Sequence, residues 1–407
     1  MPDAPDPRAE PLLSAVVGIV PQWYDADQGP HQKSLTVGGT TRTFQSTRRL
    51  TPHLNRLWGT ARASLDEWLN TLSDPPRPRE IEAVQEALVL KWLDLMAPPV
   101  DWIKLLSYVE RLRQRSYENA PVSVNLVVCQ EEGDQDVTDP AIQKVLDPLA
   151  TSPHVYLRVG PALGFLSCED VLWTEVEDSD DYKFHPEFLH PVYEHLGDGE
   201  VSVHLTARGD LVLMDPDGLL AAQRKGAWYV YDNATFKNAI VDALGGNAHY
   251  RVGANLFEVV FDLSYKRHGA LLVYDPDHVV LPHVINREAV LWGEDARPDA
   301  ARAMLADVAS EIAMGAIDHA ERRKRVLLEL ASLDGAVLFD AERVLAVGAM
   351  VSPHPDVGGH PGARTTAAES AYRWGGTALK VSSDGDVSVF FRSRSRGGES
   401  DAVMRFA

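Results

Sequence analysis

The chain has 407 residues, of which 45% are apolar and 24% charged, a composition typical of a soluble globular protein with about two or three domains. Its formal net charge of −20 argues against nucleic acid as a partner, because the mean field of the protein repels a phosphate backbone. Two cysteines, Cys129 and Cys168, are too few for a disulfide framework or a zinc cluster and fit a reducing cytoplasm.

The first ten residues are rich in Pro, Asp and Ala and lack the basic and apolar segments of a signal peptide. They predict a disordered tail on a cytoplasmic protein. The apolar run from Leu12 to Val20 is too short to span a bilayer, so no membrane contact is expected.

The next part of the chain mixes helices and strands. Residues 11–75 give few signals beyond a hairpin or loop at Gly38-Gly39. Apolar spacing predicts one helix from Ile81 to Trp92 and another that begins after a cap at Asp101. Apolar runs predict strands at residues 122–129 and 155–159. An α/β domain over residues 11–200 is therefore expected.

From about residue 200 the pattern changes to strands interleaved with helices. We expect a boundary between about 175 and 235 and a second domain over residues 201–407. The fold class is α/β (α+β), and the C-terminal domain is a mixed sheet flanked by helices. Strands are expected at residues 201–206, 211–214, 227–231, 270–274, 337–339, 344–349, 378–381 and 387–391, and helices at 235–244, 255–267, 298–314 and 318–333.

The last quarter carries the richest chemistry. Asp334-Gly335-Ala336 places a carboxylate at the entry to an apolar strand, followed by two small residues that allow a ligand to approach the backbone. Such a carboxylate can coordinate a divalent cation or polarise a sugar hydroxyl. The same tripeptide is also compatible with a plain helix end and turn.

A second motif follows at residues 362–368. Gly362, Ala363, Arg364, Thr365 and Thr366 form a turn into a helix-like segment. Backbone N–H groups at a helix start bind anions, and an arginine can hold phosphate through two hydrogen bonds. The same residues are compatible with a capping box in which Thr366 caps the helix and Glu369 closes it.

These motifs and their order resemble the diadenylate cyclase domain, over about residues 236–392. That family has an Asp-Gly-Ala motif, kept here at Asp334, Gly335 and Ala336. It has a Gly-Thr/Ala-Arg-His-Arg-Ala-Ala turn, which resembles Gly362 to Ala368. A segment with paired glutamates precedes its last strand, where this chain has Val381 to Gly385.

The resemblance implies that two ATP-loaded domains face each other in a homodimer or higher oligomer and join two ATP into cyclic di-AMP and pyrophosphate. It implies Mg²⁺ or Mn²⁺ as cofactor, with Asp334 and Asp384 as metal ligands. Gly335 and Ala336 would line the nucleotide pocket together with Asp334. Phosphate or ATP binding falls to Gly362, Ala363, Arg364, Thr365 and Thr366.

Two departures from the family leave an alternative open. Thr365 and Thr366 stand where the family has His and Arg, which removes up to two positive charges, and Ser383 replaces a carboxylate. Arg373 or Lys380 could compensate. The domain is therefore either an active variant or an impaired nucleotide or cyclic-dinucleotide sensor. In either case the N-terminal domain resembles a sensor fused to such cyclases, with an unknown ligand.

Overall fold

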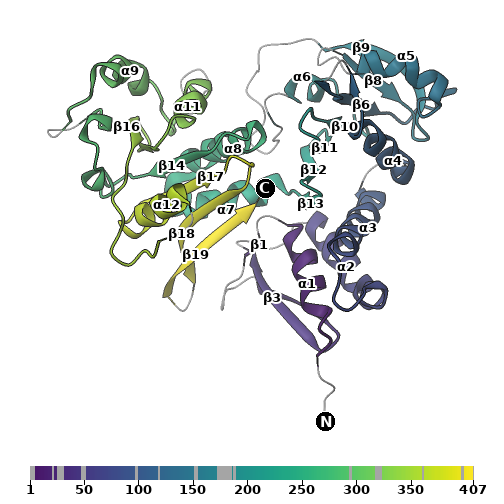
Figure 1. Cartoon of the computed structure of the whole chain (residues 1–407), viewed down its shortest axis with the longest axis horizontal. Helices are drawn as coiled ribbons and strands as arrows, with labels where there is room; N and C mark the ends of the chain where they lie inside the picture. The colour runs from purple at the N-terminus through teal and green to yellow at the C-terminus, as the bar shows by residue number, and fades with distance from the viewer. Residues whose placement is uncertain are drawn as a thin grey trace. The chain divides into compact units, whose positions relative to one another are not determined.

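The computed structural model describes residues 5–20, 23–24, 32–46, 52–96, 100–117, 120–150, 155–171, 186, 189–292, 296–316, 323–359, 362–395 and 398–406. The chain forms two compact units (Figure 1). The N-terminal unit comprises Met1–Pro21, Lys33–Phe44 and Arg49–Ala234, and the C-terminal unit comprises Gln22–Gln32, Gln45–Arg48 and Thr235–Ala407. None of the helices in the described residues is both long and apolar enough to cross a membrane.

The N-terminal unit begins with a group of three packed helices. They are α1 (Ala9–Gly18), α2 (Pro52–Thr71) and α3 (Pro78–Met96). In α2 the buried residues recur every three or four positions, from Leu54 to Leu69, which gives one apolar stripe facing its neighbours. Only α3 is predicted by the sequence.

Residues 5–10, which were expected to belong to a disordered tail, are part of the folded unit. The N–H of Asp6 donates to the carbonyl of Gly38, and Ala9 is fully buried at the start of α1. Gly38 itself joins β2 (Gln32–Val37) to β3 (Thr40–Ser46), where the hairpin was expected. Residues 1–4 lie outside the described ranges.

An eight-stranded sheet forms the rest of this unit, in the order β13-β12-β11-β10-β6-β8-β9-β7 within the described residues. β6 pairs in parallel with β8 and antiparallel with β10, so strands after residue 200 extend the first sheet. The division between units therefore falls at Ala234, at the far end of the expected range of about 175 to 235. The strands are β6 (Val124–Val128), β7 (Gln135–Asp136), β8 (Val155–Val159), β9 (Gly164–Asp170), β10 (Val201–Leu205), β11 (Leu211–Asp215), β12 (Gly218–Arg224) and β13 (Ala227–Val230).

Short elements complete the connections of this unit. The helices are α4 (Trp102–Arg113), α5 (Pro140–Ala150) and α6 (His190–Tyr193), and β4 (Ser116–Tyr117) pairs with β5 (Ala120–Pro121). Asp101 caps α4 as expected, because its carboxylate accepts from the N–H of Lys104 at 3.0 Å.

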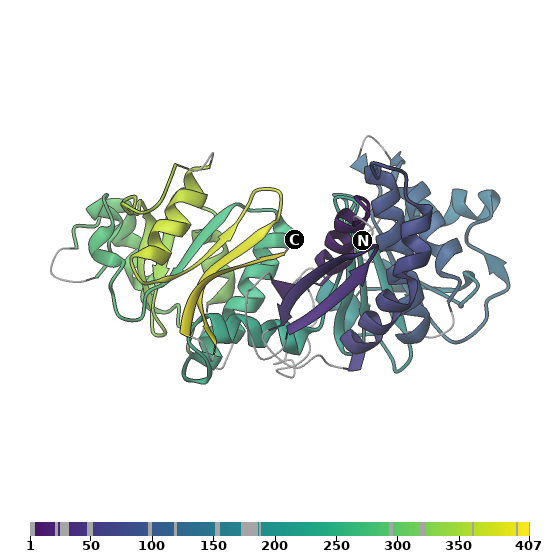
Figure 2. The ribbon, with the colours of Figure 1, turned by 90° about the horizontal axis from the view of Figure 1, so that it is seen from below.

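The C-terminal unit is built on a mixed sheet in the order β16-β15-β14-β17-β18-β19. Among the described strands of this sheet, β14 and β15 pair in parallel, and the other neighbouring strands pair antiparallel. The long hairpin of β18 and β19 is visible as the yellow arrows in Figure 2. The strands are β14 (Ala270–Tyr274), β15 (Ala336–Phe339), β16 (Val344–Ala349), β17 (Thr377–Val381), β18 (Val387–Ser395) and β19 (Gly398–Phe406), while β1 (Trp23–Tyr24) pairs with Gln45 and Ser46.

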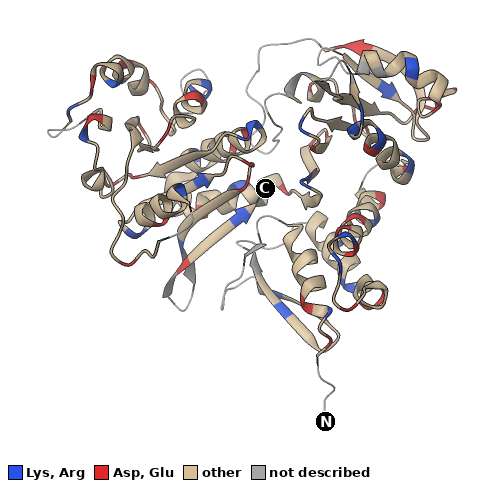
Figure 3. Ribbon diagram, in the orientation of Figure 1, with Lys and Arg blue, Asp and Glu red and all other residues tan. Residues whose placement is uncertain are grey.

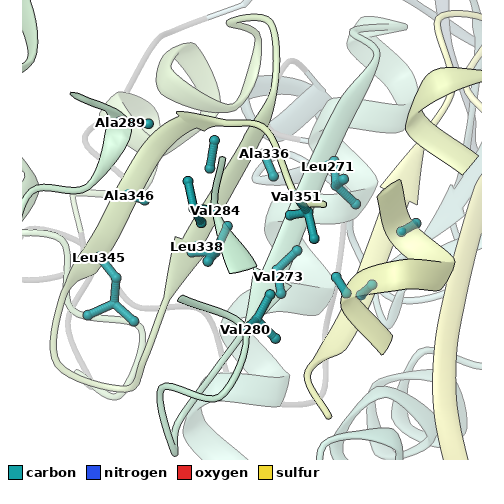
Figure 4. Close-up of a cluster of buried hydrophobic side chains, with 14 of the residues drawn as sticks. Leu271, Val273, Val280, Val284, Ala289, Ala336, Leu338, Leu345, Ala346 and Val351 are labelled. Atoms are coloured by element: carbon teal, nitrogen blue, oxygen red, sulfur yellow. The ribbon is translucent and has the colours of Figure 1, made fainter. Parts of the chain in front are cut away.

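Helices cover this sheet. Alternate residues of β14, Leu271 and Val273, pack in one apolar cluster with Ala368 and Ala371 of α12 (Figure 4). The opposite side chains of β14 are also buried, and α8 and α11 contact the sheet as well. The helices are α7 (Asn233–Ala243), α8 (Tyr250–Lys266), α9 (Ala300–Ser310), α11 (Lys324–Ala331) and α12 (Ala363–Arg373).

The expected fold class, α/β (α+β) with a mixed C-terminal sheet flanked by helices, is therefore confirmed at that level. The basic and acidic residues are interspersed on both units (Figure 3). The expected helix over residues 318–333 is described only from residue 323, where α11 follows Arg323.

Candidate functional site

The two sequence motifs meet at one edge of the C-terminal sheet. The parallel pair β14 and β15 begins at this edge, and the antiparallel β17 ends there, with Ala270 opposite Val381. Gly269, Asp334 and the turn after Val381 therefore lie at the same edge. Arg364, in the first turn of α12, reaches this group.

Arg364 connects three of these segments. Its Nη2 lies 3.4 Å from Oδ1 of Asp334. A Cβ added to Gly269 would lie 2.5 Å from Nη1 of Arg364 and 3.4 Å from the backbone nitrogen of Ser383. Glycine at position 269 thus leaves the space that the guanidinium fills. The Asp334 side chain is fully exposed and that of Arg364 is 37% exposed, so both remain accessible to a ligand.

A second cation contacts the first turn of α12. Lys380, on β17, donates from Nζ to Oγ1 of Thr365 at 3.0 Å. Arg373, the other residue that could compensate, instead pairs with Asp401 at 2.6 Å. Of the two compensating cations considered from the sequence, the one in contact with the Gly362 turn is therefore Lys380.

The start of α12 differs from the expected capping box. Gly362 is the N-cap, and no side chain caps the helix. The N–H groups of Thr365 and Thr366 both donate to the carbonyl of Gly362, and the Thr366 hydroxyl lies 3.5 Å from the same oxygen. Thr366 belongs to the first helical turn because the helix starts at Ala363, so the capping box is wrong. The first N–H groups of a helix have no intrahelical acceptor, which leaves this end suited to an anion.

Gly335 serves the packing of the strands. Its φ is +102°, and an added Cβ would lie 2.4 Å from the carbonyl carbon of Gly348. The glycine is therefore required by a close approach to the neighbouring strand β16. The side chain of Ala336 is fully buried in the cluster beneath α12, so this residue could line a pocket only through its backbone. At this edge, the groups available to a ligand are the carboxylate of Asp334 and the backbone of Gly335 and Ala336.

Asp384 lies in the turn between β17 and β18. The turn is held by hydrogen bonds between Ser382 and Asp386, and the hydroxyl of Ser264 donates to the carbonyl of Gly385 at 2.6 Å. In the part of the chain that the structure describes, no group of three or more His, Cys, Asp or Glu side chains is placed to hold a metal ion.

The donor set nevertheless fits a metal that arrives with phosphates. Mg²⁺ is usually held by one or two carboxylates and the oxygens of its substrate, with water in the remaining positions. Asp334, exposed at the edge beside Arg364, supplies one such carboxylate. The sequence motifs did not identify Gly269 and Gly348, whose close contacts with Arg364 and Gly335 appear only in the structure.

Comparison with known protein families finds no match, and neither does comparison with curated proteins. Among solved structures, DacA from Staphylococcus aureus, crystallised as a double mutant, aligns at 18% identity over 38% of this chain and 87% of its own, with a TM-score of 0.23. A hypothetical membrane spanning protein from Bacillus cereus aligns at 16% identity over 43% of this chain and 75% of its own, with a TM-score of 0.25. Scores this low carry no argument about function.

Proposed function

We propose that the C-terminal unit binds ATP at the edge formed by Asp334, Arg364 and Lys380, and that it condenses two ATP into one cyclic di-AMP with release of two pyrophosphates. The observation that supports the proposal is the pair of motifs brought together, with Arg364 in contact with Asp334. A carboxylate, a guanidinium and a helix start at one exposed edge are the groups that a metal-bound triphosphate needs.

Each group has a role in this proposal. Arg364 binds phosphate oxygens through its guanidinium, and Lys380 adds positive charge behind Thr365. Asp334 holds the metal and orients the ribose 3′-hydroxyl that attacks the α-phosphate of the second ATP. The metal supplies positive charge that offsets the charge of the phosphates. Because one nucleotide provides the hydroxyl and another the phosphate, the reaction requires two sites facing each other in a dimer.

The charge balance supports a second candidate. A phosphate site with His and Arg replaced by Thr365 and Thr366 has fewer cations, and Lys380 restores only one. Each lost charged hydrogen bond is worth about 1.5–3 kcal/mol. The alternative is therefore a sensor that binds ATP or a cyclic dinucleotide at the same edge without turnover.

One incubation separates these candidates. The full chain is incubated with labelled ATP and either Mn²⁺ or Mg²⁺, and the products are separated by chromatography, while calorimetry measures ATP binding. Cyclic di-AMP together with pyrophosphate supports the cyclase. Binding without product supports the sensor. Absence of both product and binding overturns the proposal.

A further inference from the structure

His268 lies at the edge that carries Asp334 and has no role in the site described so far. The parallel register sets Leu272 of β14 opposite Val337 of β15, and the same offset brings Gly269 beside Asp334. His268 comes directly before Gly269, between the end of α8 and the start of β14. The residue is exposed, so its imidazole is accessible to a molecule bound at this edge.

The backbone of His268 is fixed by the end of α8. Arg267 adopts a left-handed conformation there, with φ at +53°. The N–H of His268 then donates to the carbonyl of Leu263 at 3.1 Å, which satisfies one of the last carbonyls of the helix. The imidazole therefore extends from a backbone held by the helix end.

The hydrogen bonds of Ser332 determine which nitrogen of the neutral imidazole carries the proton. Nδ1 of His268 lies 2.8 Å from Oγ of Ser332, which follows α11 and precedes Asp334 by two residues. The hydroxyl of Ser332 donates its single proton to the carbonyl of Leu328 at 2.9 Å. Its oxygen can therefore only accept from His268, so Nδ1 carries the proton. Nε2 is left with a lone pair and has no partner among the described residues.

The helix ends around Asp334 differ in their partial charge. Helix α12 begins at this edge, and its N–H groups together with Arg364 favour a phosphate. Helices α8 and α11 instead end beside His268 and Ser332, and the carbonyl end of a helix disfavours an anion. An uncharged donor, such as a sugar hydroxyl, is therefore the part of a nucleotide that suits Nε2 of His268.

We propose that His268 accepts the proton of the ribose 3′-hydroxyl as this hydroxyl attacks the second ATP, an inference that rests on the proposed function. The 3′-oxygen forms a bond to the α-phosphorus, and the hydroxyl proton moves to Nε2. The bond between the α-phosphorus and the bridging oxygen breaks, and pyrophosphate leaves with its electron pair. The exposed imidazolium then returns the proton to water. A base in this position commonly accelerates a reaction by about 10²–10⁴-fold.

Turnover of ATP by the full chain with Mn²⁺ tests this assignment in His268→Ala. We expect kcat for cyclic di-AMP formation to fall by at least about 10²-fold. KM should stay within about twofold of the wild-type value, because the interaction acts in the chemical step. Added imidazole should raise kcat of His268→Ala by at least about tenfold, since a small base can reach an exposed position, and should leave the wild type unchanged. Urea denaturation reports the folding of each variant.

His53→Ala, which removes an exposed histidine on α2, is the matched control and should keep the wild-type kcat. An unchanged kcat in His268→Ala overturns this inference and leaves the proposed function standing. A loss of kcat that imidazole does not restore, or a loss of activity that appears in KM alone, also overturns it. Absence of cyclic di-AMP from the wild type overturns both the cyclase reaction and the role of His268.

Discussion

Nη2 of Arg364 lies 3.4 Å from Oδ1 of Asp334, a contact that joins motifs 30 residues apart in the chain. The carboxylate is fully exposed, so water screens the pair and its contribution to stability is small. Exchange of partners at this contact therefore costs little free energy. Under the proposed function, a phosphate would replace the carboxylate at Arg364 while a cation binds Asp334.

The first prediction concerns Asp334. Under the cyclase proposal, Asp334→Asn should lower the rate of cyclic di-AMP formation by at least about 10²-fold, because the charge at the reacting hydroxyl is lost. Its free energy of unfolding should stay close to that of the wild type, because the side chain is fully exposed. Product is measured by chromatography and stability by urea denaturation. Asp277→Asn, exposed in the turn after β14, is the matched control. Wild-type turnover in Asp334→Asn would contradict the assignment.

Arg364 should dominate the affinity for ATP. Arg364→Ala removes a charged hydrogen-bond donor to phosphate worth about 1.5–3 kcal/mol, so ATP should bind about 10–100-fold more weakly. Calorimetry measures the change. Arg251→Ala, which removes an exposed arginine at the start of α8, should bind ATP as the wild type does. Equal losses in the two variants would show a general charge effect instead of a site.

Lys380 should make a smaller contribution. Its Nζ lies 3.0 Å from Oγ1 of Thr365, so under the proposed function this cation acts on the phosphates from behind that residue. Lys380→Met keeps the length of the side chain and removes the charge, and ATP should bind about 3–10-fold more weakly. The affinity of Thr365→Val, which keeps the cation, separates the charge from the hydrogen bond. An unchanged affinity in Lys380→Met would exclude a role for this cation.

For the C-terminal sheet, the sequence predicted where strands lie in the chain better than it predicted which strands pair with each other. Apolar runs identify β14 and β15, but periodicity does not record that these strands pair in parallel or that β17 returns antiparallel beside β14. That pairing places Lys380 near Thr365 and leaves Arg373 paired with Asp401. The alternative in which Thr366 caps α12 is wrong because Gly362 takes the N-cap position.

The division of the chain into two units also depends on long-range strand pairing, which the local sequence pattern does not show. The strands after residue 200 follow the sequence pattern of the second half of the chain, in which strands alternate with helices. However, β10 pairs with β6 along five residues and so belongs to the first sheet. Long-range pairing of this kind depends on which buried strand offers a free edge, which a local pattern does not encode.

Gly335 gives a prediction about stability. Gly335→Ala would place a Cβ 2.4 Å from the carbonyl carbon of Gly348 at a φ of +102°. Backbone must move to relieve this contact, so the free energy of unfolding should fall by about 2 kcal/mol or more. Gly358→Ala meets no atom within 4 Å and should leave stability unchanged. Equal urea midpoints for the two variants would contradict the close approach of β15 and β16.

Asp215 gives a dependence of stability on pH. Burial raises its pKa to about 6 from the ordinary 3.8, while the N–H of Asp217 donates to Oδ1 at 2.8 Å and opposes the shift. Between these two pKa values the folded state binds more protons than the unfolded state, so stability falls as pH rises through this window. At a pH above the folded-state pKa, a shift of about two units lowers the free energy of unfolding by about 2–3 kcal/mol. At a pH below the unfolded-state pKa, the shift has no effect on stability.

Asp215→Asn keeps the oxygen that accepts from Asp217 and removes the charge. It should therefore raise the free energy of unfolding of the N-terminal unit by about 2 kcal/mol at about pH 8, with little change at about pH 4. Urea denaturation at both pH values measures the difference. Asp198→Asn, on an exposed turn, should show no such dependence. A gain of stability confined to acidic pH would reverse the sign and contradict burial as the cause of the raised pKa.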